Sequence, residues 1–148
     1  TLGYTVWERV KKLKPEFSAL SGPEIAQRKQ SGEPLFNTVE RPLVSFCGDT
    51  TIKVVDQQPH LLQSRVLLLE TTYIDNRRSV AQCRKHGHIH LDEVLERAEK
   101  FQNEHLVFIH FSQGYRIKEI HKIVTERCRD RFTPQIHPFV PKSGTWPG

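Results

Sequence analysis

RVLLL at residues 65–69 and LVFIHF at residues 106–111 are the two stretches that decide the fold. RVLLL, like LVSFC at residues 43–47, has too few polar interruptions for a half-exposed surface strand, which predicts strands covered on both faces. LVFIHF predicts a third buried strand. Between RVLLL and LVFIHF, apolar residues recur at helical spacing from Leu91 to Phe101, and acidic residues occupy the first turn. This alternation of buried strand and helix predicts a layered α/β domain.

The flanking sequence extends the same alternation. Residues 4–10 and 43–47 have the β-branched and aromatic content of strands, and residues 21–30 read as a turn followed by a short helix. Beyond the second apolar run, aliphatic residues at helical spacing from Ile117 to Val124 predict an amphipathic helix. The whole pattern is typical of one α/β domain.

The end of the chain has a different composition. Residues 132–148 contain four prolines, which predicts an extended segment without regular structure. We therefore expect a domain over residues 1–131 and a proline-rich extended tail over residues 132–148.

The bulk composition restricts the setting and the partners. A net charge of +5 favours an anionic partner such as a nucleic acid, although a solvated basic surface explains the same charge. Three cysteines without CxxC spacing favour a reducing, intracellular setting, but they do not distinguish cytosol, nucleus or organelle. No apolar run reaches 18 residues, so we expect no membrane partner.

Polar side chains at the ends of the predicted strands are candidate functional residues, because loops at strand ends carry function on a rigid scaffold. Asp49 can bridge two metal ions with its two oxygens, and an Asx-turn or a helix cap explains it as well. Glu70 ends an apolar strand, where a carboxylate is either paired or catalytic. His110 ends the next strand, where an imidazole binds a metal or is a hydrogen-bonded core residue.

HGHIHLDE at residues 86–93 is the densest histidine cluster. His88, His90 and Asp92 follow the spacing of the H-x-H-x-D-H ligand run of binuclear metallohydrolases. Glu93 stands where the final histidine should be, and the acidic pair is also explained by the helix that begins there. The helix start is the favoured interpretation of the acidic residues.

Four motifs in this order resemble the second half of tRNase Z, closest to its short plant-type forms. They are GDT at 48–50, ETTY at 70–73, GHIH at 87–90 and HFS at 110–112. Residues 13–33 also resemble the proline–glycine segment that precedes the metal aspartate in that family. The resemblance covers roughly residues 1–125.

The resemblance implies the C-terminal half of a metallo-β-lactamase αββα sandwich, which holds two zinc ions at one edge of its sheets. It implies that Asp49 bridges both ions and that His110 binds one of them. It further implies that His88, acting with Glu70, protonates the leaving 3′ oxygen. The implied substrate is precursor tRNA, and the implied reaction is removal of its 3′ trailer.

The resemblance also implies an incomplete zinc site. The remaining ligands of the family lie in the first half of the fold, so we expect a chain or segment that supplies the N-terminal half. Gly114, before Tyr115, stands where the family usually has arginine, which leaves one phosphate or structural contact in doubt.

Three functions therefore fit the sequence, and whether the chain is an enzyme depends on the missing half. The first is part of a zinc-dependent endoribonuclease. The second is a catalytically inactive half-domain that acts as a structural or RNA-binding subunit of a larger complex, such as a ribonucleoprotein assembly. The third is a hydrolase of the same fold for small phosphodiesters or thioesters, against which the combination of Glu70 and His88 favours tRNA.

Overall fold

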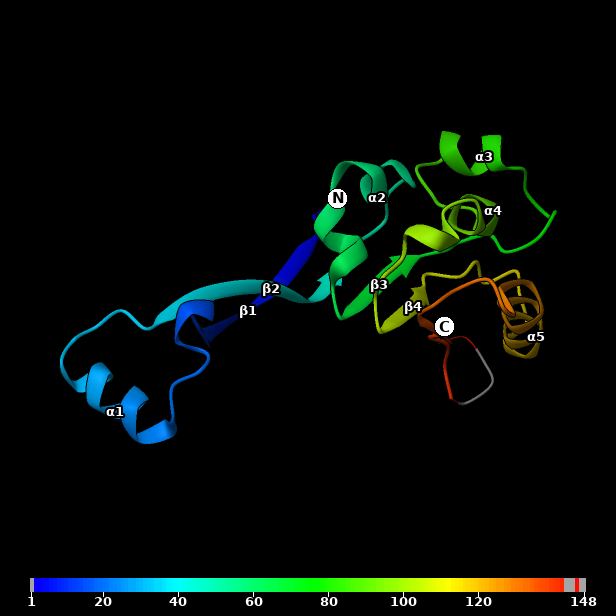
Figure 1. Cartoon of the computed structure of the whole chain (residues 1–148). Helices are drawn as coiled ribbons and strands as arrows, with labels where there is room; N and C mark the ends of the chain where they lie inside the picture. Colours follow the sequence, from blue (N-terminus) through cyan, green and yellow to red (C-terminus); the bar gives the residue numbers. More distant parts are fainter. Residues whose placement is uncertain (1, 143–145, 147–148) are drawn as a thin grey trace. The chain divides into compact units, whose positions relative to one another are not determined.

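The computed structural model describes residues 2–142 and 146, and it divides into two compact units (Figure 1). The small unit is residues 7–41, and the main unit comprises residues 1–6 and 42–148. The candidate functional residues all belong to the main unit.

The small unit contains parts of two strands and one regular helix. These are the larger parts of β1 (Tyr4–Leu13) and β2 (Phe36–Phe46), the 3₁₀ turn η1 (Pro15–Phe17) and α1 (Gly22–Gln30). Helix α1 begins where Glu24 accepts hydrogen bonds from the backbone N–H and the hydroxyl of Ser21, at 2.8 and 2.6 Å. This capping arrangement is why the serine, glycine and proline before the helix start it as predicted.

The main unit carries the remaining elements. In chain order they are α2 (Lys53–Gln57), η2 (Pro59–Gln63), β3 (Val66–Glu70), α3 (Val80–Lys85), α4 (Leu91–Leu95), η3 (Ala98–Lys100), β4 (His105–Ile109), α5 (Ile117–Cys128) and β5 (Gln135–Pro138). Strands and helices alternate along most of this region. The predicted α/β class is confirmed.

The sheet has the strand order β1-β2-β3-β4-β5, and the strands from β2 to β5 are parallel neighbours. The register pairs Phe46 with Leu68 and Glu70 with Ile109. The carboxyl ends of β2, β3 and β4 consequently lie at one edge of the sheet. Segments that follow these three strands are brought together there.

One face of the sheet carries the core. Leu67 and Leu69 of β3 and Phe108 of β4 are fully buried and belong to the same cluster as Val94 of α4 and Ile120 of α5. Residues that point to the opposite face, such as those at 66, 68 and 107, are only partly buried. The prediction of coverage on both faces is confirmed on the core face, whereas side chains on the second face are only partly buried within this chain.

The helix predicted from Leu91 to Phe101 is interrupted. Helix α4 ends at Leu95, and η3 resumes as a 3₁₀ turn after Arg97, whose backbone φ of −112° departs from helical values. Val94, Ala98 and Phe101 are nevertheless buried on one side. A spacing of three to four residues is kept by successive helical turns of either type, so the periodicity does not reveal the break.

The prediction of irregular structure throughout the proline-rich segment is wrong at β5. This strand lies at the edge of the sheet, and Pro138 pairs with Phe108 at its end. An edge position tolerates a residue that has no N–H to donate, and the next residue, Phe139, donates to the Phe108 carbonyl at 2.8 Å. The boundary at residue 131 stays a prediction, and tail residues 143–145 and 147–148 lie outside the described residues.

Candidate metal and catalytic site

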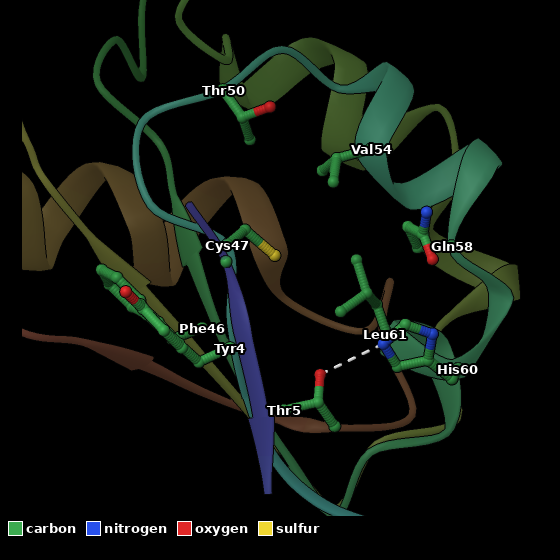
Figure 2. A pocket seen from close by; sticks show the side chains of 10 residues that line it. Tyr4, Thr5, Phe46, Cys47, Thr50, Val54, Gln58, His60 and Leu61 are labelled. Carbon is green, nitrogen blue, oxygen red and sulfur yellow. Dashed lines mark hydrogen bonds between the residues drawn. The ribbon is translucent and has the colours of Figure 1, made fainter. Parts of the chain in front are cut away.

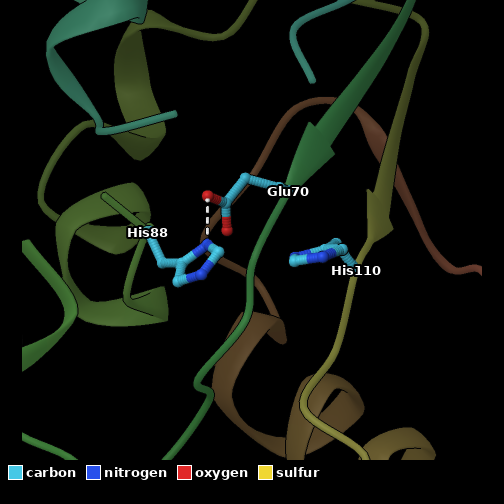
Figure 3. A group of neighbouring side chains, drawn as sticks. All are labelled: Glu70, His88 and His110. Atoms are coloured by element: carbon cyan, nitrogen blue, oxygen red, sulfur yellow. Dashed lines mark hydrogen bonds and ion pairs between the residues drawn. The ribbon is translucent and has the colours of Figure 1, made fainter. Parts of the chain in front are cut away.

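Asp49, Glu70, His88 and His110 come together at the carboxyl-end edge of the sheet. Glu70 is the last residue of β3, and Asp49 and His110 follow β2 and β4. Figure 3 shows His88 and His110 on either side of the Glu70 carboxylate, and the two imidazole centroids are 5.2 Å apart. The Asp49 Oδ1 lies 3.5 Å from the His110 Nε2. The four residues singled out in the sequence thus form one cluster.

The Glu70 carboxylate is fully buried and accepts a hydrogen bond from four donors. Its Oε1 receives the Thr50 N–H at 3.1 Å and the His88 Nδ1 at 3.1 Å. Its Oε2 receives the Thr72 N–H at 3.3 Å and the Thr72 hydroxyl at 2.8 Å. A buried carboxylate with both oxygens satisfied is held in a fixed position, so Glu70 is a rigid acceptor for the imidazole.

His88 reaches this carboxylate from the loop after α3. Gly87 has a φ of +77°, a conformation that glycine adopts without a steric penalty, and it turns the chain back at the end of the helix. Because the carboxylate can only accept, the His88 Nδ1 is the donor, and the Nε2 is left for another partner. The side chain is 25% exposed, so His88 is partly open to solvent.

Thr72 joins Glu70 to His110. Its hydroxyl proton is directed to the Glu70 Oε2, so its oxygen accepts from the His110 Nδ1 at 3.1 Å. The proton of a neutral His110 is therefore on Nδ1, and the lone pair of Nε2 faces outward. The backbone of His110 has a φ of +59°, an uncommon left-handed conformation for a residue with a side chain and one that is often found at functional sites.

The gap between Asp49 and His110 fits a metal ion. At 3.5 Å the Oδ1 and Nε2 atoms are too far apart for an ordinary N–H···O hydrogen bond, and both are acceptors when His110 is neutral. A tetrahedral ion with ligands at about 2.0–2.2 Å separates neighbouring ligand atoms by roughly 3.3–3.5 Å. The two side chains are 52% and 44% exposed, which leaves room for further ligands.

A second donor set overlaps the first. Glu70, His88 and His110 each place a potential ligand atom within 4.8 Å of the others. Both Glu70 oxygens and the His88 Nδ1 are already used in hydrogen bonds, whereas the Asp49 oxygen and the His110 Nε2 are not bonded to each other. We therefore favour the Asp49–His110 pair as the position of an ion.

The neighbouring polar residues of the histidine cluster have structural partners. The His90 Nδ1 accepts from the Asp92 N–H at 3.1 Å, and its Nε2 donates to the Asp75 carbonyl at 2.9 Å. Asp92 binds Arg127, and Glu93 binds Arg84 at 2.6 Å. These contacts start and anchor α4. The interpretation of the acidic pair as a helix start agrees with this geometry.

Thr50 and Thr72 belong to the site, but the sequence analysis named only the motifs that contain them and not these two residues. Thr72 belongs to the ETTY motif and lies two residues after Glu70 in the sequence. Among the residues that the structure describes, its hydroxyl is the only side-chain group that bonds both Glu70 and His110. A threonine two residues after a strand-end carboxylate was the available signal. Its importance depends on the position of His110, which is distant in sequence.

Arg77 contacts both Gly114 and Tyr115. The Arg77 guanidinium donates to the Gly114 carbonyl at 3.0 Å and lies over the Tyr115 ring at 4.3 Å. Tyr115 is buried and donates to Asp75 at 2.8 Å, and burial raises the pKa of Tyr115 to about 12. A Cβ added at Gly114 would approach only the Ser112 Oγ, at 3.5 Å, so the backbone does not require glycine there.

A separate cavity of about 300 Å³ adjoins α2 and η2 (Figure 2). Two of its lining residues, Thr5 and His60, belong to a ring of hydrogen bonds with Ser45 and Ser64. The Ser64 hydroxyl donates to the His60 carbonyl at 3.1 Å, and Ser45 contacts Ser64 at 2.5 Å and Thr5 at 3.0 Å. Each hydroxyl has one proton, so the direction runs from the His60 Nε2 through Thr5 and Ser45 to Ser64. These polar groups are satisfied within the protein, and they have a structural role.

Carboxylate and imidazole groups, which meet here at the strand ends, are the ligand types of hydrolytic metal sites. The chain is 42% identical over 125 residues to tRNase Z TRZ1 of Arabidopsis thaliana, which is 83% of this chain and 45% of that protein. It is 30% identical over 124 residues to the chloroplastic tRNase Z TRZ2 of the same organism, which is 82% of this chain and 35% of that protein. The resemblance to tRNase Z is confirmed.

The chain spans less than half the length of these two relatives. No family model matches the sequence. One solved structure with a similar arrangement is the metallo-β-lactamase fold protein YhfI from Bacillus subtilis, with a TM-score of 0.49 and 13% sequence identity. That likeness covers 98% of this chain and 53% of YhfI, and it concerns the fold alone.

Among the described residues, no helix is long and apolar enough to cross a membrane. The intracellular setting expected from the cysteines stays a prediction.

Proposed function

We propose that this chain is one portion of a zinc-dependent endoribonuclease that removes the 3′ trailer from precursor tRNA. The observation that carries the proposal is the position of the Glu70–His88 pair beside the Asp49–His110 gap, at one edge of a parallel sheet. A proton donor next to a metal position is the combination that hydrolysis of a phosphodiester requires. The names of the two relatives support tRNA as the substrate.

In the proposed reaction, water attacks the scissile phosphorus, its oxygen stays on the phosphate as the P–O3′ bond breaks, and one of its protons is released to solvent, from which His88 is later reprotonated. His88 gives the proton of its Nε2 to the departing 3′ oxygen, so that the tRNA ends in a 3′ hydroxyl and the trailer keeps a 5′ phosphate. Glu70 accepts from the Nδ1, which orients the ring and stabilises its protonated form. Thr72 and Thr50 hold the Glu70 carboxylate in place.

Asp49 and His110 are the residues that would hold zinc, because their outward oxygen and nitrogen atoms form the gap described above. When bound, a pair of zinc ions supplies the activated water and offsets the negative charge that develops on the phosphate. Thr72 fixes the His110 tautomer, which keeps the Nε2 lone pair available.

The remaining zinc ligands would come from a chain or segment that forms the N-terminal half of a metallo-β-lactamase αββα sandwich. Two observations support this partner. A structural or catalytic zinc site needs at least three protein ligands, and Asp49 and His110 provide two. The sheet face that carries residues 66, 68 and 107 is apolar but only partly buried, as expected for a surface that another layer covers.

The alternative is a catalytically inactive half-domain that serves as a structural or RNA-binding subunit of a larger ribonucleoprotein assembly. The observation in its favour is Gly114, which replaces the usual arginine at a position where the backbone accepts a side chain. An inactive half-domain has no evident need for a buried Glu70 carboxylate that accepts four hydrogen bonds, one of them from His88.

Metal content of the assembled protein separates the two functions. The enzyme should hold about two zinc ions per complete site, and Asp49→Ala should lose zinc and trailer cleavage together. Asp56→Ala is the matched control, because Asp56 is an exposed aspartate paired with Arg97 at 2.9 Å, away from the site. Absence of zinc from the purified assembly, or full cleavage by Asp49→Ala, would refute the proposal.

A further inference from the structure

A cavity of about 260 Å³ adjoins the proposed proton donor, and we call it the Arg78 pocket. Its lining residues are Tyr73, Arg78, Gln82, His86 and His88. His88 is the only one of the four candidate site residues in this lining, so the pocket lies on the His88 side of the site. None of its lining residues is acidic, and the pocket therefore suits an anionic or neutral ligand.

Local structure fixes the walls of the Arg78 pocket. Ser79 caps the start of helix α3 (Val80–Lys85), where its hydroxyl accepts from the Gln82 N–H at 3.2 Å, and His86 caps the end of the helix. The left-handed Gly87 then returns the chain to His88. On the opposite side, the Tyr73 carbonyl accepts from the Leu91 N–H at 2.9 Å, which fastens the segment after β3 to the start of α4.

The two neighbouring arginines have different roles. Arg77 binds Glu119 at 2.6 Å, Asp75 at 3.3 Å and the Gly114 carbonyl, so its donors serve the fold. Arg78 is exposed, lines the pocket, and makes no hydrogen bond or ion pair with the residues that the structure describes. Its guanidinium is free for a planar anionic group, for which arginine has a suitable set of donors.

The chemistry of His88 determines which part of a substrate enters the pocket. The Nδ1 is engaged by Glu70, so the Nε2 must contact the leaving 3′ oxygen. That oxygen belongs to the nucleotide on the 5′ side of the scissile bond, which therefore lies against His88. Tyr73 offers an aromatic surface to a base, and Arg78 offers a charged donor to a phosphate.

We propose that the Arg78 pocket binds the last nucleotide of the mature tRNA, with Arg78 on the phosphate that precedes this nucleotide and Tyr73 against its base. This inference rests on the proposed function, since it assigns the leaving-group side of the same site. The pocket accepts single-stranded RNA, because a base can reach Tyr73 only when it is unstacked from a helix.

The test removes the charge of Arg78 in the complete assembled protein and measures the kinetics of precursor tRNA cleavage. Arg78→Gln should raise KM for precursor tRNA about tenfold and leave kcat nearly unchanged, because a phosphate contact made in both ground and transition states is lost. Arg78→Lys should recover part of this loss. Lys85→Gln is the control, since Lys85 is an exposed cation at the end of the same helix but outside the pocket lining.

A substrate with a neutral methylphosphonate in place of the phosphate before the last nucleotide identifies the contact. This change should raise the KM of the wild type about tenfold and leave the KM of Arg78→Gln unchanged. Equal sensitivity of both proteins, or equal kinetics for Arg78→Gln and Lys85→Gln, would overturn the inference.

If the assembled protein does not cleave precursor tRNA, measuring its affinity for tRNA still tests the proposed role of the Arg78 pocket. A tRNA that ends at its last nucleotide, without a trailer, should bind Arg78→Gln about tenfold more weakly than Lys85→Gln, and only when the preceding linkage is charged. A failure of cleavage with this pattern of binding rejects the proposed function and keeps the pocket. Equal tRNA affinity of Arg78→Gln and Lys85→Gln rejects the proposed role of the Arg78 pocket.

Discussion

The His88 Nδ1 lies 3.1 Å from the Oε1 of Glu70, a carboxylate with no exposed surface. Glu70→Gln keeps the shape of the side chain but removes the charge that orients and stabilises a protonated His88. We expect precursor cleavage to fall about 100-fold, the usual size of a lost acid–base contribution. The measurement is single-turnover trailer cleavage by the assembled protein.

Glu93→Gln is the matched control for this change. Glu93 is equally buried, and it binds Arg84 at 2.6 Å and the His90 N–H at 3.1 Å. Its neutralisation should lower the free energy of unfolding without a specific loss of the cleavage step. Comparable losses of single-turnover rate in the two folded variants would mean that Glu70 has only a structural role.

Thr72→Val tests the hydrogen bond that fixes His110. The hydroxyl links the Glu70 Oε2 to the His110 Nδ1, and without it the imidazole loses its preferred tautomer and orientation. We expect zinc affinity to fall about tenfold, as for other lost partners of metal ligands. Competition with a chelator measures this directly.

Thr71→Val provides the comparison for Thr72. Thr71 is also fully buried, but among the residues that the structure describes its hydroxyl bonds only to the Leu69 carbonyl, at 3.5 Å. Its replacement should leave zinc affinity within about twofold of the wild type. If the two valine variants retain zinc equally well, the Thr72 bridge does not support the metal site.

The Asp56–Arg97 pair should make a pH-dependent contribution to stability. Hydrogen bonding from Arg97 lowers the pKa of the Asp56 carboxyl. A carboxyl with a lowered folded-state pKa stabilises the fold above its unfolded value, about 3.9, and this contribution is lost as the pH falls through the folded-state pKa.

Asp56→Asn should therefore lower the free energy of unfolding by about 0.5–1 kcal/mol at pH 7, a modest effect because solvent screens this exposed pair. The difference from the wild type should shrink as the pH falls below about 3.9 and through the lowered folded-state pKa of Asp56, where the wild-type carboxyl also becomes neutral. Denaturant unfolding at pH 7 and across this acidic range is the measurement. Glu99→Gln, at an exposed acidic residue of η3, should show no such trend, and a pH-independent loss in Asp56→Asn would contradict the account.

The cysteines should report unfolding. Cys47, Cys83 and Cys128 are free and buried, and burial raises the pKa of the Cys47 and Cys128 thiols to about 11. At pH 8 the thiolate fraction of these two is then about 100-fold below that of an unfolded cysteine. Alkylation followed by mass spectrometry should show slow native labelling that becomes fast in denaturant. Rapid native labelling of Cys128 would contradict the packing around α5.

The sequence was sufficient to predict the elements that form the site. The apolar runs that end at Glu70 and His110 are strong strand patterns, and the helix that begins after Arg116 follows from aliphatic spacing alone. The resemblance to tRNase Z implied that Asp49, Glu70 and His110 share one site, and the parallel pairing of β2, β3 and β4 explains it, because parallel strands present their carboxyl ends at one edge.

Other features depend on contacts that no local pattern specifies. Strand β5 forms because the edge of β4 is available, despite Pro138. The break after Leu95 leaves the apolar spacing intact, so periodicity predicted one continuous helix. The double role of Thr72 needs the positions of Glu70 and His110 in space, which are set by strand pairing over a long sequence separation.

The central claim is that His88 protonates the leaving 3′ oxygen, and replacement of His88 tests it most directly. His88→Ala should be compared with the wild type in the assembled protein on precursor tRNA and on bis(p-nitrophenyl) phosphate, whose leaving group needs no proton. The account predicts a loss of about 100-fold or more on tRNA and little change on the activated diester. An equal loss on both substrates would contradict it.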